Sequence, residues 1–395
     1  MSKLIKLVLS ACLICNIIVA HADTDLNTKI HQELATHYKQ YKDREYFSGG
    51  AVSFYIPNQD IKSFYIGTVS HAAGSKSVTA ETLFEVGSIT KSFTSALILQ
   101  LEKEHKINLT DTLRVWLPEY PLWGDIGIEA LLNMTSGVPN YTDTPIWLAT
   151  EYADLMRVWT SDEIIKYVYP PNGITPPLKQ GYYYSNSNYL LAELIIDKIT
   201  QKHFKDYLLQ LFKNADLKNT FYPIPTADPA IQNRSAIGYN YNQYDNPLFV
   251  GKSTQNSLSW MAGAGGIVAD SADIVKWIQA LFTKNNILDA TQKQKLTRLI
   301  STDSGESIAK TTPDDKQGYG LGVAEGYNKD IGRYWFYEGE TLGFRAMYVY
   351  VPCNGIIIST VFNSSTYPGN DHMGNLLENI YQDIIGKYPQ LACKT

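Results

Sequence analysis

Apolar side chains recur at helical spacing near both ends of the chain. Between residues 26 and 41, an apolar or aromatic side chain returns every three or four positions, at Leu26, Ile30, Leu34, Tyr38 and Tyr41. A second such face, near the C-terminus, comprises Met373, Leu376, Leu377, Ile380, Tyr381, Ile384 and Ile385. Because residues at this spacing share one side of an α-helix, we predict an amphipathic helix near each end.

Four segments rich in β-branched and aromatic residues form two pairs, each joined by a short turn that contains Pro and Asn. The pairs are residues 51–56 with 61–66 and residues 344–351 with 356–362, joined through residues 57–60 and 352–355. Such pairs are typical of β-hairpins. We therefore predict an α+β fold in which one antiparallel sheet, built from both ends of the chain, is covered by helices.

The middle of the chain has a different composition. Residues 107–250 are irregular and rich in Pro, Asn, Tyr and Trp, with helical patterns at 161–169 and 189–199. We predict that this segment is an inserted, mostly helical domain, so that residues 23–106 and 251–395 together form the sheet domain. With 395 residues, the chain is long enough for two closely packed domains.

The first 22 residues have the features of a secretory signal peptide. Two lysines precede a predominantly apolar run over residues 7–20, and Ala20-His21-Ala22 forms a small-x-small cleavage pattern. We predict cleavage after Ala22 and a periplasmic or secreted protein. The alternative is lipidation at Cys12, within the lipoprotein-like sequence Leu9-Ser10-Ala11-Cys12.

Cysteines and charge narrow the functional classes further. After removal of the leader only Cys353 and Cys393 remain, and the sequence leaves open whether they are bridged or unpaired. The formal net charge is −5 and there is no basic block, which argues against a nucleic-acid partner. No spacing in the sequence resembles a zinc site, and no second segment is apolar enough to span a bilayer.

A serine stands three residues before a lysine at the start of an apolar helical pattern, in Val86-Gly87-Ser88-Ile89-Thr90-Lys91-Ser92-Phe93. Positions three apart share a helix face, so Lys91 can reach the Ser88 hydroxyl beside the free N–H groups of the helix start. A serine hydroxyl needs such help to act as a nucleophile. The same pattern recurs at Ser307-Ile308-Ala309-Lys310, but in a polar loop. The structural alternative for Ser88 is a helix-capping serine beside a solvated lysine.

Two further segments could complete a site around Ser88. Tyr184-Ser185-Asn186 stands at the mouth of a second apolar helix. A phenol beside an ammonium group has its ionised form favoured, so Tyr184 could serve as base and acid. The third segment, Tyr337-Glu338-Gly339-Glu340, leads into a predicted strand and could offer a backbone N–H group to a substrate. Its structural alternative is a glycine-containing turn.

In this order, the three segments resemble the motifs of the serine β-lactamase and penicillin-binding DD-peptidase superfamily. The closest resemblance is to its class C β-lactamase and D-Ala-D-Ala carboxypeptidase branch. Residues 131–139 resemble the Leu-Leu-x-His-Thr-Ser-Gly segment of that family, with Met134 at the His position, and residues 262–268 resemble its Gly-Gly strand. The resemblance covers residues 45–385 and implies a β-lactamase/transpeptidase-like fold with the site in a cleft between the domains.

The resemblance also implies roles for individual residues. The catalytic residues would be Ser88, Lys91 and Tyr184, and the substrate-binding residues would be Asn186, Tyr337, Gly339 and Glu340. Ser88 would be acylated, Lys91 and Tyr184 would manage its proton, and the N–H groups of Ser88 and Glu340 would form the oxyanion hole. Because this chemistry needs no metal or organic cofactor, none is expected.

One departure from the family pattern bears on the substrate. Tyr337, uncharged at neutral pH, stands where the family has His or Lys, a cation that commonly helps to hold a substrate carboxylate. Glu338 and Glu340 lower the local positive charge further. Together these residues put recognition of penicillins and of D-Ala-D-Ala peptides in doubt.

Three functional hypotheses therefore remain. The first is an exported serine hydrolase that resembles D-Ala-D-Ala carboxypeptidases and β-lactamases and acts on a small molecule or a peptidoglycan-like peptide. The second is an esterase or amidase for small neutral substrates, and the third is a catalytically silent binding module. The sequence leaves the oligomeric state and the rate of deacylation open.

Overall fold

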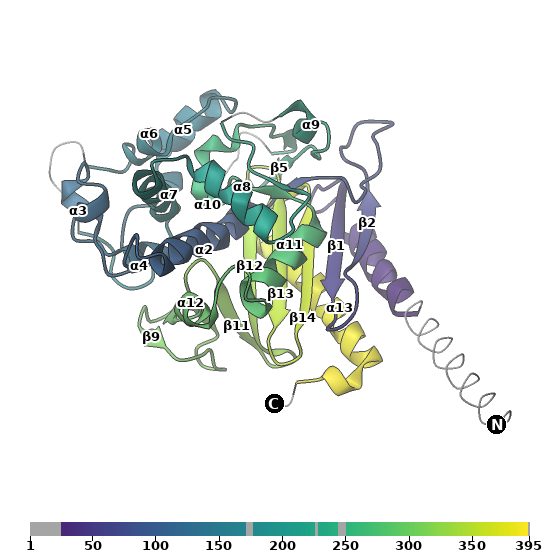
Figure 1. Cartoon of the computed structure of the whole chain (residues 1–395). Helices are drawn as coiled ribbons and strands as arrows, with labels where there is room; N and C mark the ends of the chain where they lie inside the picture. Colours follow the sequence, from purple (N-terminus) through teal and green to yellow (C-terminus); the bar gives the residue numbers. More distant parts are fainter. Residues whose placement is uncertain (1–24, 171–176, 226–227, 244–249, 394–395) are drawn as a thin grey trace, which may run out of the picture.

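The computed structural model describes residues 25–170, 177–225, 228–243 and 250–393. The predicted leader, including Cys12, lies outside the described residues. The described part of the chain contains a nine-stranded sheet with the strand order β2-β1-β14-β13-β12-β11-β10-β8-β9 (Figure 1). In that order the strands are Lys62–Gly67, Gly49–Tyr55, Ile356–Phe362, Arg345–Val351, Gly332–Glu340, Ala324–Asn328, Gln317–Tyr319, Leu299–Ser301 and Ser307–Ile308.

Both ends of the chain build this sheet, as predicted. Strand β1 pairs with β2 in one predicted hairpin and β13 pairs with β14 in the other, both antiparallel. The hairpins join where β1 pairs with β14, with Gly50 opposite Phe362. The predicted terminal helices are present as residues 25–41 and α13 (Met373–Lys387). The predicted α+β fold is therefore confirmed.

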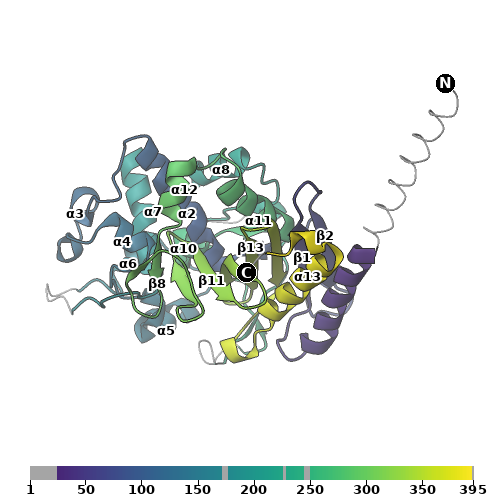
Figure 2. The same cartoon turned by 90° about the horizontal axis from the view of Figure 1, so that it is seen from below.

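Alternating side chains of the sheet pack into two cores. Val52 and Phe54 of β1 point toward the helix at residues 25–41 and α13, whereas Ala51 faces the larger core on the opposite side. This alternation is the two-residue period of a strand that is buried on both faces. Seen from below, α13 and the N-terminal helix lie side by side on one face of the sheet, joined by a Lys29–Asp383 ion pair at 2.6 Å (Figure 2).

Helices α2 (Thr90–Lys103) and α11 (Ser271–Ile278) belong to the core on the other face, where Figure 1 shows α11 in front of the sheet. The remaining helices of the described chain are α3 (Leu113–Trp116), α4 (Ile128–Leu132), α5 (Pro145–Ala153), α6 (Ser161–Ile165), α7 (Ser187–Thr200), α8 (Phe204–Asn214), α9 (Pro229–Gln232), α10 (Ala262–Gly265) and α12 (Ala290–Leu296). Most of them fall in the segment predicted as a helical insertion, and the domain boundaries stay a prediction.

Two small three-stranded sheets connect this segment to the large sheet. One contains β3 (Phe84–Glu85), β7 (Val268–Ala269) and β4 (Thr220–Phe221). The other contains β15 (Ser364–Thr366), β5 (Tyr239–Tyr241) and β6 (Lys252–Ser253). In each sheet one strand, β4 or β5, comes from residues 107–250, and the other two strands come from outside this segment.

Two local predictions were wrong. The helix predicted over residues 161–169 ends at Ile165 as α6, and its last residues form turns. Residues 262–268, which resemble a strand, begin instead with the short helix α10, and only Val268 enters a strand. The glycines of α10 allow close packing, because a Cβ on Gly263 would lie 3.0 Å from the backbone oxygen of Tyr189 in α7.

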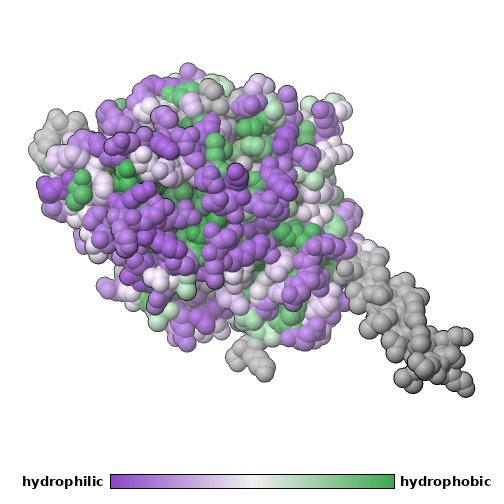
Figure 3. All heavy atoms as spheres, viewed as in Figure 1, coloured by the Kyte–Doolittle hydropathy of each residue, from purple (hydrophilic) through white to green (hydrophobic). Residues whose placement is uncertain are grey.

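The face of the molecule seen in Figure 3 is predominantly polar. Figure 3 shows hydrophilic residues over most of the visible face, with apolar patches between them. Within the described ranges, no helix is both long and apolar enough to cross a membrane.

Cys353 and Cys393 form a disulfide, a point that the sequence left open. Their Cα atoms lie 5.8 Å apart, a usual separation for bridged cysteines. The bond ties the turn between β13 and β14 to the segment that follows α13. Disulfides persist in oxidising compartments, which agrees with the predicted export.

We predict that replacing both cysteines by serine lowers the free energy of unfolding by about 4 kcal/mol, since the bridge closes a loop between positions 40 residues apart. Urea unfolding followed by circular dichroism measures this change. Reductant should lower the midpoint of the wild type and leave that of the double variant unchanged. Equal midpoints for the oxidised wild type and the double variant would contradict the prediction.

Candidate active site

Ser88 lies in a tight turn that leads directly into α2. Residues Gly87–Ile89 form a 3₁₀ turn, η1, and Thr90 begins the α-helix. The backbone of Gly87 has φ of +49°, a conformation that glycine adopts without strain. The turn presents Ser88 at the start of the helix, as the sequence predicted, with 8 % of its surface exposed.

Lys91 is fully buried one turn along α2. Its Nζ lies 2.8 Å from Ser88 Oγ, 2.8 Å from Asn186 Oδ1 and 2.8 Å from the backbone oxygen of Ala264. Burial lowers the pKa of Lys91 well below its ordinary value, because a charged amine is poorly solvated there. A neutral amine would donate its two hydrogens to Asn186 and Ala264 and direct its lone pair at the Ser88 hydroxyl. This is the arrangement required of a general base.

Tyr184 contacts Ser88 from the opposite side. Its hydroxyl oxygen lies 2.6 Å from Ser88 Oγ, and its ring packs 5.0 Å from Lys91 Nζ. The expectation of an ionised phenol is not met, because burial raises the pKa of Tyr184 to about 12. The hydrogen bond with Ser88 opposes this rise only in part. The Tyr184 phenol is therefore neutral. Its hydroxyl can donate its own proton to one group and accept a proton from another.

The turn at residues 184–186 is held in place by an earlier segment. The backbone N–H of Asn186 donates to Asn140 Oδ1 at 2.9 Å, and that of Ser185 points at Met134 Sδ at 3.4 Å. The backbone of Met134 also accepts from the N–H of Tyr183 at 2.8 Å. Met134, which replaces a histidine of the family segment, therefore supports the Tyr184 turn from behind.

The edge of β12 forms a third side of the site around Ser88. In an antiparallel pair, residues alternate between hydrogen-bonded and open positions. The N–H of Thr341 donates to the oxygen of Phe344, so Glu340, one residue earlier, directs its own N–H away from β13. A Cβ on Gly87 would lie 2.7 Å from the Glu340 nitrogen, which places this N–H group against the Ser88 turn.

Gly339 allows this close approach. A Cβ at Gly339 would overlap the oxygen of Val86 and lie 2.9 Å from the Ser88 nitrogen. The absence of a side chain therefore lets β12 pack directly on η1, with the N–H groups of Ser88 and Glu340 at the same place. This arrangement can stabilise an oxyanion.

Tyr337 lies beside Tyr184 in an aromatic, uncharged part of the wall. It is 5 % exposed, and its hydroxyl oxygen lies 2.6 Å from that of Tyr319. Burial raises the pKa of Tyr337 well above its ordinary value, so the phenol stays neutral. The position at which the family carries a cation therefore carries none here.

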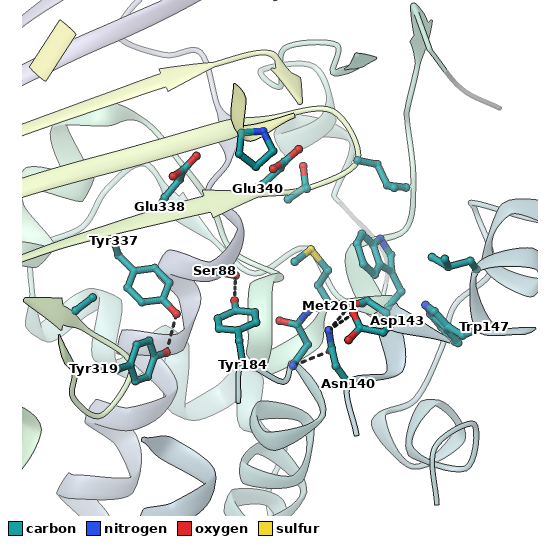
Figure 4. A pocket seen from close by; sticks show the side chains of 18 of the residues that line it. Ser88, Asn140, Asp143, Trp147, Tyr184, Met261, Tyr319, Tyr337, Glu338 and Glu340 are labelled. Atoms are coloured by element: carbon teal, nitrogen blue, oxygen red, sulfur yellow. Dashed lines mark hydrogen bonds between the residues drawn. The ribbon is translucent and has the colours of Figure 1, made fainter. Parts of the chain in front are cut away.

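These residues meet in a cleft of about 740 Å³ (Figure 4). Ser88 and Tyr184 occupy its middle, with Tyr337 and Tyr319 on one side and Asn140, Asp143 and Trp147 on the other. Lining residues that sequence reasoning missed include Asn140, Asp143, Trp147, Glu151, Tyr182, Trp260, Met261 and Tyr319. Of these, only Asn140 carried a sequence signal, because it directly follows the family-like segment at residues 131–139.

A family model described as Beta-lactamase matches residues 34–381. Among curated proteins, the chain is 24 % identical over 275 residues to a penicillin-binding protein of Bacillus subtilis (strain 168), covering 68 % of this chain and 57 % of that protein. It is 28 % identical over 202 residues to the teichoic acid D-alanine hydrolase of Staphylococcus aureus, covering 51 % and 46 %. The chain thus spans about half the length of the curated relatives it matches.

A solved structure supports the fold. The D-amino acid amidase of Ochrobactrum anthropi SV3, complexed with L-phenylalanine amide, superposes with a TM-score of 0.77. The alignment covers 92 % of this chain and 99 % of the amidase, at 22 % sequence identity. At this identity, the likeness establishes the shared fold only.

We predict that Gly339→Ala lowers kcat by about 10²- to 10³-fold, the usual effect of losing one oxyanion donor. The new Cβ must push β12 away from η1. Gly386→Ala is the matched control, because a Cβ at that position in α13 would meet nothing within 4 Å. Steady-state kinetics on any accepted ester tests this, with circular dichroism to confirm the fold. Equal kcat values for both variants would refute this account of β12.

We also predict an acid limb in the pH profile of kcat/KM that reports deprotonation of Lys91. Below its lowered pKa the amine is protonated and cannot accept the Ser88 proton, so activity falls as pH falls. Lys91→Arg, which stays charged, should lower kcat/KM by about 10²- to 10⁴-fold at neutral pH. Lys103→Arg, on the same helix but half-exposed, should retain the wild-type profile. Substantial activity of Lys91→Arg would show that Lys91 is not the base.

Proposed function

The chain belongs to the Beta-lactamase family of serine hydrolases, and from this we propose that it hydrolyses an acyl substrate through a covalent intermediate on Ser88. The observation that supports this most strongly is the hydrogen-bonded group of Ser88, Lys91 and Tyr184, with distances of 2.8 and 2.6 Å to Ser88 Oγ. An activated nucleophile and a base in contact are what acyl transfer requires.

In the proposed reaction, the neutral amine of Lys91 accepts the Ser88 proton while Oγ attacks the substrate carbonyl. The oxyanion accepts hydrogen bonds from the N–H groups of Ser88 and Glu340. Tyr184, bonded to Ser88, passes a proton to the leaving group as the carbonyl bond to that group breaks. Water then attacks the acyl-enzyme by the same route in reverse, which returns the proton to Ser88.

Within this class, we favour an amidase or esterase over a carboxypeptidase. A carboxypeptidase must hold the terminal carboxylate of its substrate, and a penicillin carries a similar anion. The lining residues of the described cleft include no Lys, Arg or His, and the family cation is replaced by Tyr337. Tyr337 and Tyr319 instead offer an apolar, uncharged space for the leaving group.

The silent binding module is the least supported alternative. A protein without catalytic activity has no need to bury a lysine, since an unpaired buried amine costs free energy. Lys91 is nevertheless fully buried and aligned on Ser88.

Export remains part of the proposal. The disulfide between Cys353 and Cys393 suits an oxidising compartment, and the S. aureus relative is named for teichoic acid, a cell-wall polymer. The leader predicted from the sequence would supply the route.

We predict that a fluorophosphonate probe adds one covalent mass at Ser88 and that Ser88→Ala abolishes the addition. Ser307→Ala, at the second Ser-x-x-Lys sequence, is the matched control and should label like the wild type. Peptide mass spectrometry locates the adduct. Turnover of p-nitrophenyl acetate, nitrocefin and a D-Ala-D-Ala peptide then separates the esterase from the β-lactamase and carboxypeptidase. A folded protein that resists the probe would refute the proposal and favour the binding module.

A further inference from the structure

The described lining of the cleft contains four carboxyl groups and no basic side chain. Among the described lining residues, Asp143, Glu151, Glu338 and Glu340 are acidic and none is basic. The amine of Lys91 lies beneath Ser88, fully buried, and its lowered pKa reduces its charge. A substrate in this cleft therefore meets carboxyl groups that a bound cation could ionise, and no basic side chain of the described lining competes with that cation.

Glu151 is the most unusual of these carboxylates. It lies near the end of α5 with 2 % of its surface exposed, and its Oε1 is buried without a hydrogen-bond partner among the described residues. Burial raises its pKa to about 8, so the carboxyl group is neutral at neutral pH while it has no partner. A positively charged ligand beside it would lower this pKa and favour the carboxylate. Natural proteins rarely leave a buried carboxylate oxygen unpaired, so a partner from outside the chain is indicated.

Asp143 and Glu340 already have hydrogen-bond partners within the chain, and Glu338 has Asp371 and Arg345 as charged neighbours. Asp143 accepts hydrogen bonds from Asn140 Nδ2 at 2.7 Å and from the Tyr183 hydroxyl at 3.1 Å. Glu340 accepts from Asn242 Nδ2 at 3.4 Å. Glu151 is therefore the acidic group in this cleft that is best placed to bind a ligand.

A second buried polar group near Glu151 also lacks a hydrogen-bond partner in the described chain. Trp147, one helical turn earlier on α5, has a buried indole N–H group without a partner among the described residues. Figure 4 places Trp147 on the side of Ser88 away from Tyr337. Two polar atoms without partners in the described chain, Glu151 Oε1 and Trp147 Nε1, thus belong to residues one turn apart on α5 that both line the cleft.

This end of the cleft receives the acyl half of the substrate in the proposed mechanism. In that mechanism the leaving group occupies the space beside Tyr337 and Tyr319, which lie together on one side of Ser88 (Figure 4). The acyl group would then extend to the other side of Ser88, where Asn140 and Trp147 of α5 lie.

We propose that the cleft selects substrates whose acyl group carries a protonated amine, with the Glu151 carboxylate as the ion partner of that amine. This inference rests on the proposed function and specifies its substrate class as aminoacyl esters or amides. An ammonium group supplies both the hydrogen-bond donors and the charge that Glu151 lacks. An acyl group with a methyl in the same position would leave the carboxylate unpaired.

The test compares the methyl esters of D- and L-alanine with methyl isobutyrate, which has the same shape with a methyl in place of the ammonium. At pH 6.5 the amine is protonated, since α-amino groups titrate at about 8. We expect kcat/KM for one alanine ester to exceed that for isobutyrate by at least about tenfold, the usual effect of a hydrogen bond to a charged group. The ratio of these two kcat/KM values is unaffected by any change that alters the hydrolysis of both esters equally.

Glu151→Gln should lower this ratio by about tenfold or more. Glu119→Gln, the same change at an exposed glutamate outside the cleft, is the matched control and should keep the wild-type ratio. A wild-type ratio near one, or a ratio unchanged in Glu151→Gln, overturns the inference. So does the absence of hydrolysis of every ester while Ser88 still reacts with a fluorophosphonate. Loss of that reactivity would instead refute the proposed function.

Discussion

Lys91 extends from α2 into a space closed by α7 and α10, and its amine is accommodated there because two oxygens accept its hydrogens. Asn186 supplies one oxygen from the start of α7 and Ala264 supplies the other from α10, each 2.8 Å from Nζ. The requirement to satisfy one buried amine therefore fixes how these helices meet. The same contacts orient its lone pair toward Ser88. The contacts of the Lys91 amine thus link the packing of the three helices to the direction of its lone pair. A change in that packing would also change how the amine faces Ser88.

The second constraint is the approach of β12 to the Ser88 turn. Gly87 in the turn packs against the backbone of β12, and Gly339 in β12 packs against the backbone of the turn. A side chain at either position would collide with backbone atoms. In the proposed mechanism Lys91 and Tyr184 control the proton of Ser88, whereas this contact sets where the oxyanion would lie. The acidic side chains of β12 then line the cleft beside that position. The edge of β12 thus supplies both a backbone N–H donor and carboxyl side chains to the cleft.

The sequence predicted the parts of this arrangement that depend on local pattern. Helical spacing predicted the terminal helices, and segments rich in β-branched and aromatic residues around short turns predicted both hairpins. The motifs predicted Ser88, Lys91, Tyr184 and Asn186, which the structure brings together. The sequence could not give the protonation state of Tyr184, because burial, which raises its pKa, depends on residues from distant segments. Glu151 was missed for a similar reason. An unpaired carboxylate is recognisable only once its neighbours are known.

The pairing of β1 with β14 has a consequence for how the chain reaches its native state. Gly50 pairs with Phe362, so the central strand ladder closes across more than three hundred residues of intervening chain. A vectorially emerging polypeptide exposes β1 and β2 long before their neighbour exists, and contacts of such high sequence separation form slowly. Completion of the sheet must await nearly the whole chain. Such a topology delays folding until late in synthesis, an interval that the proposed export would use to move the chain while it is still unfolded.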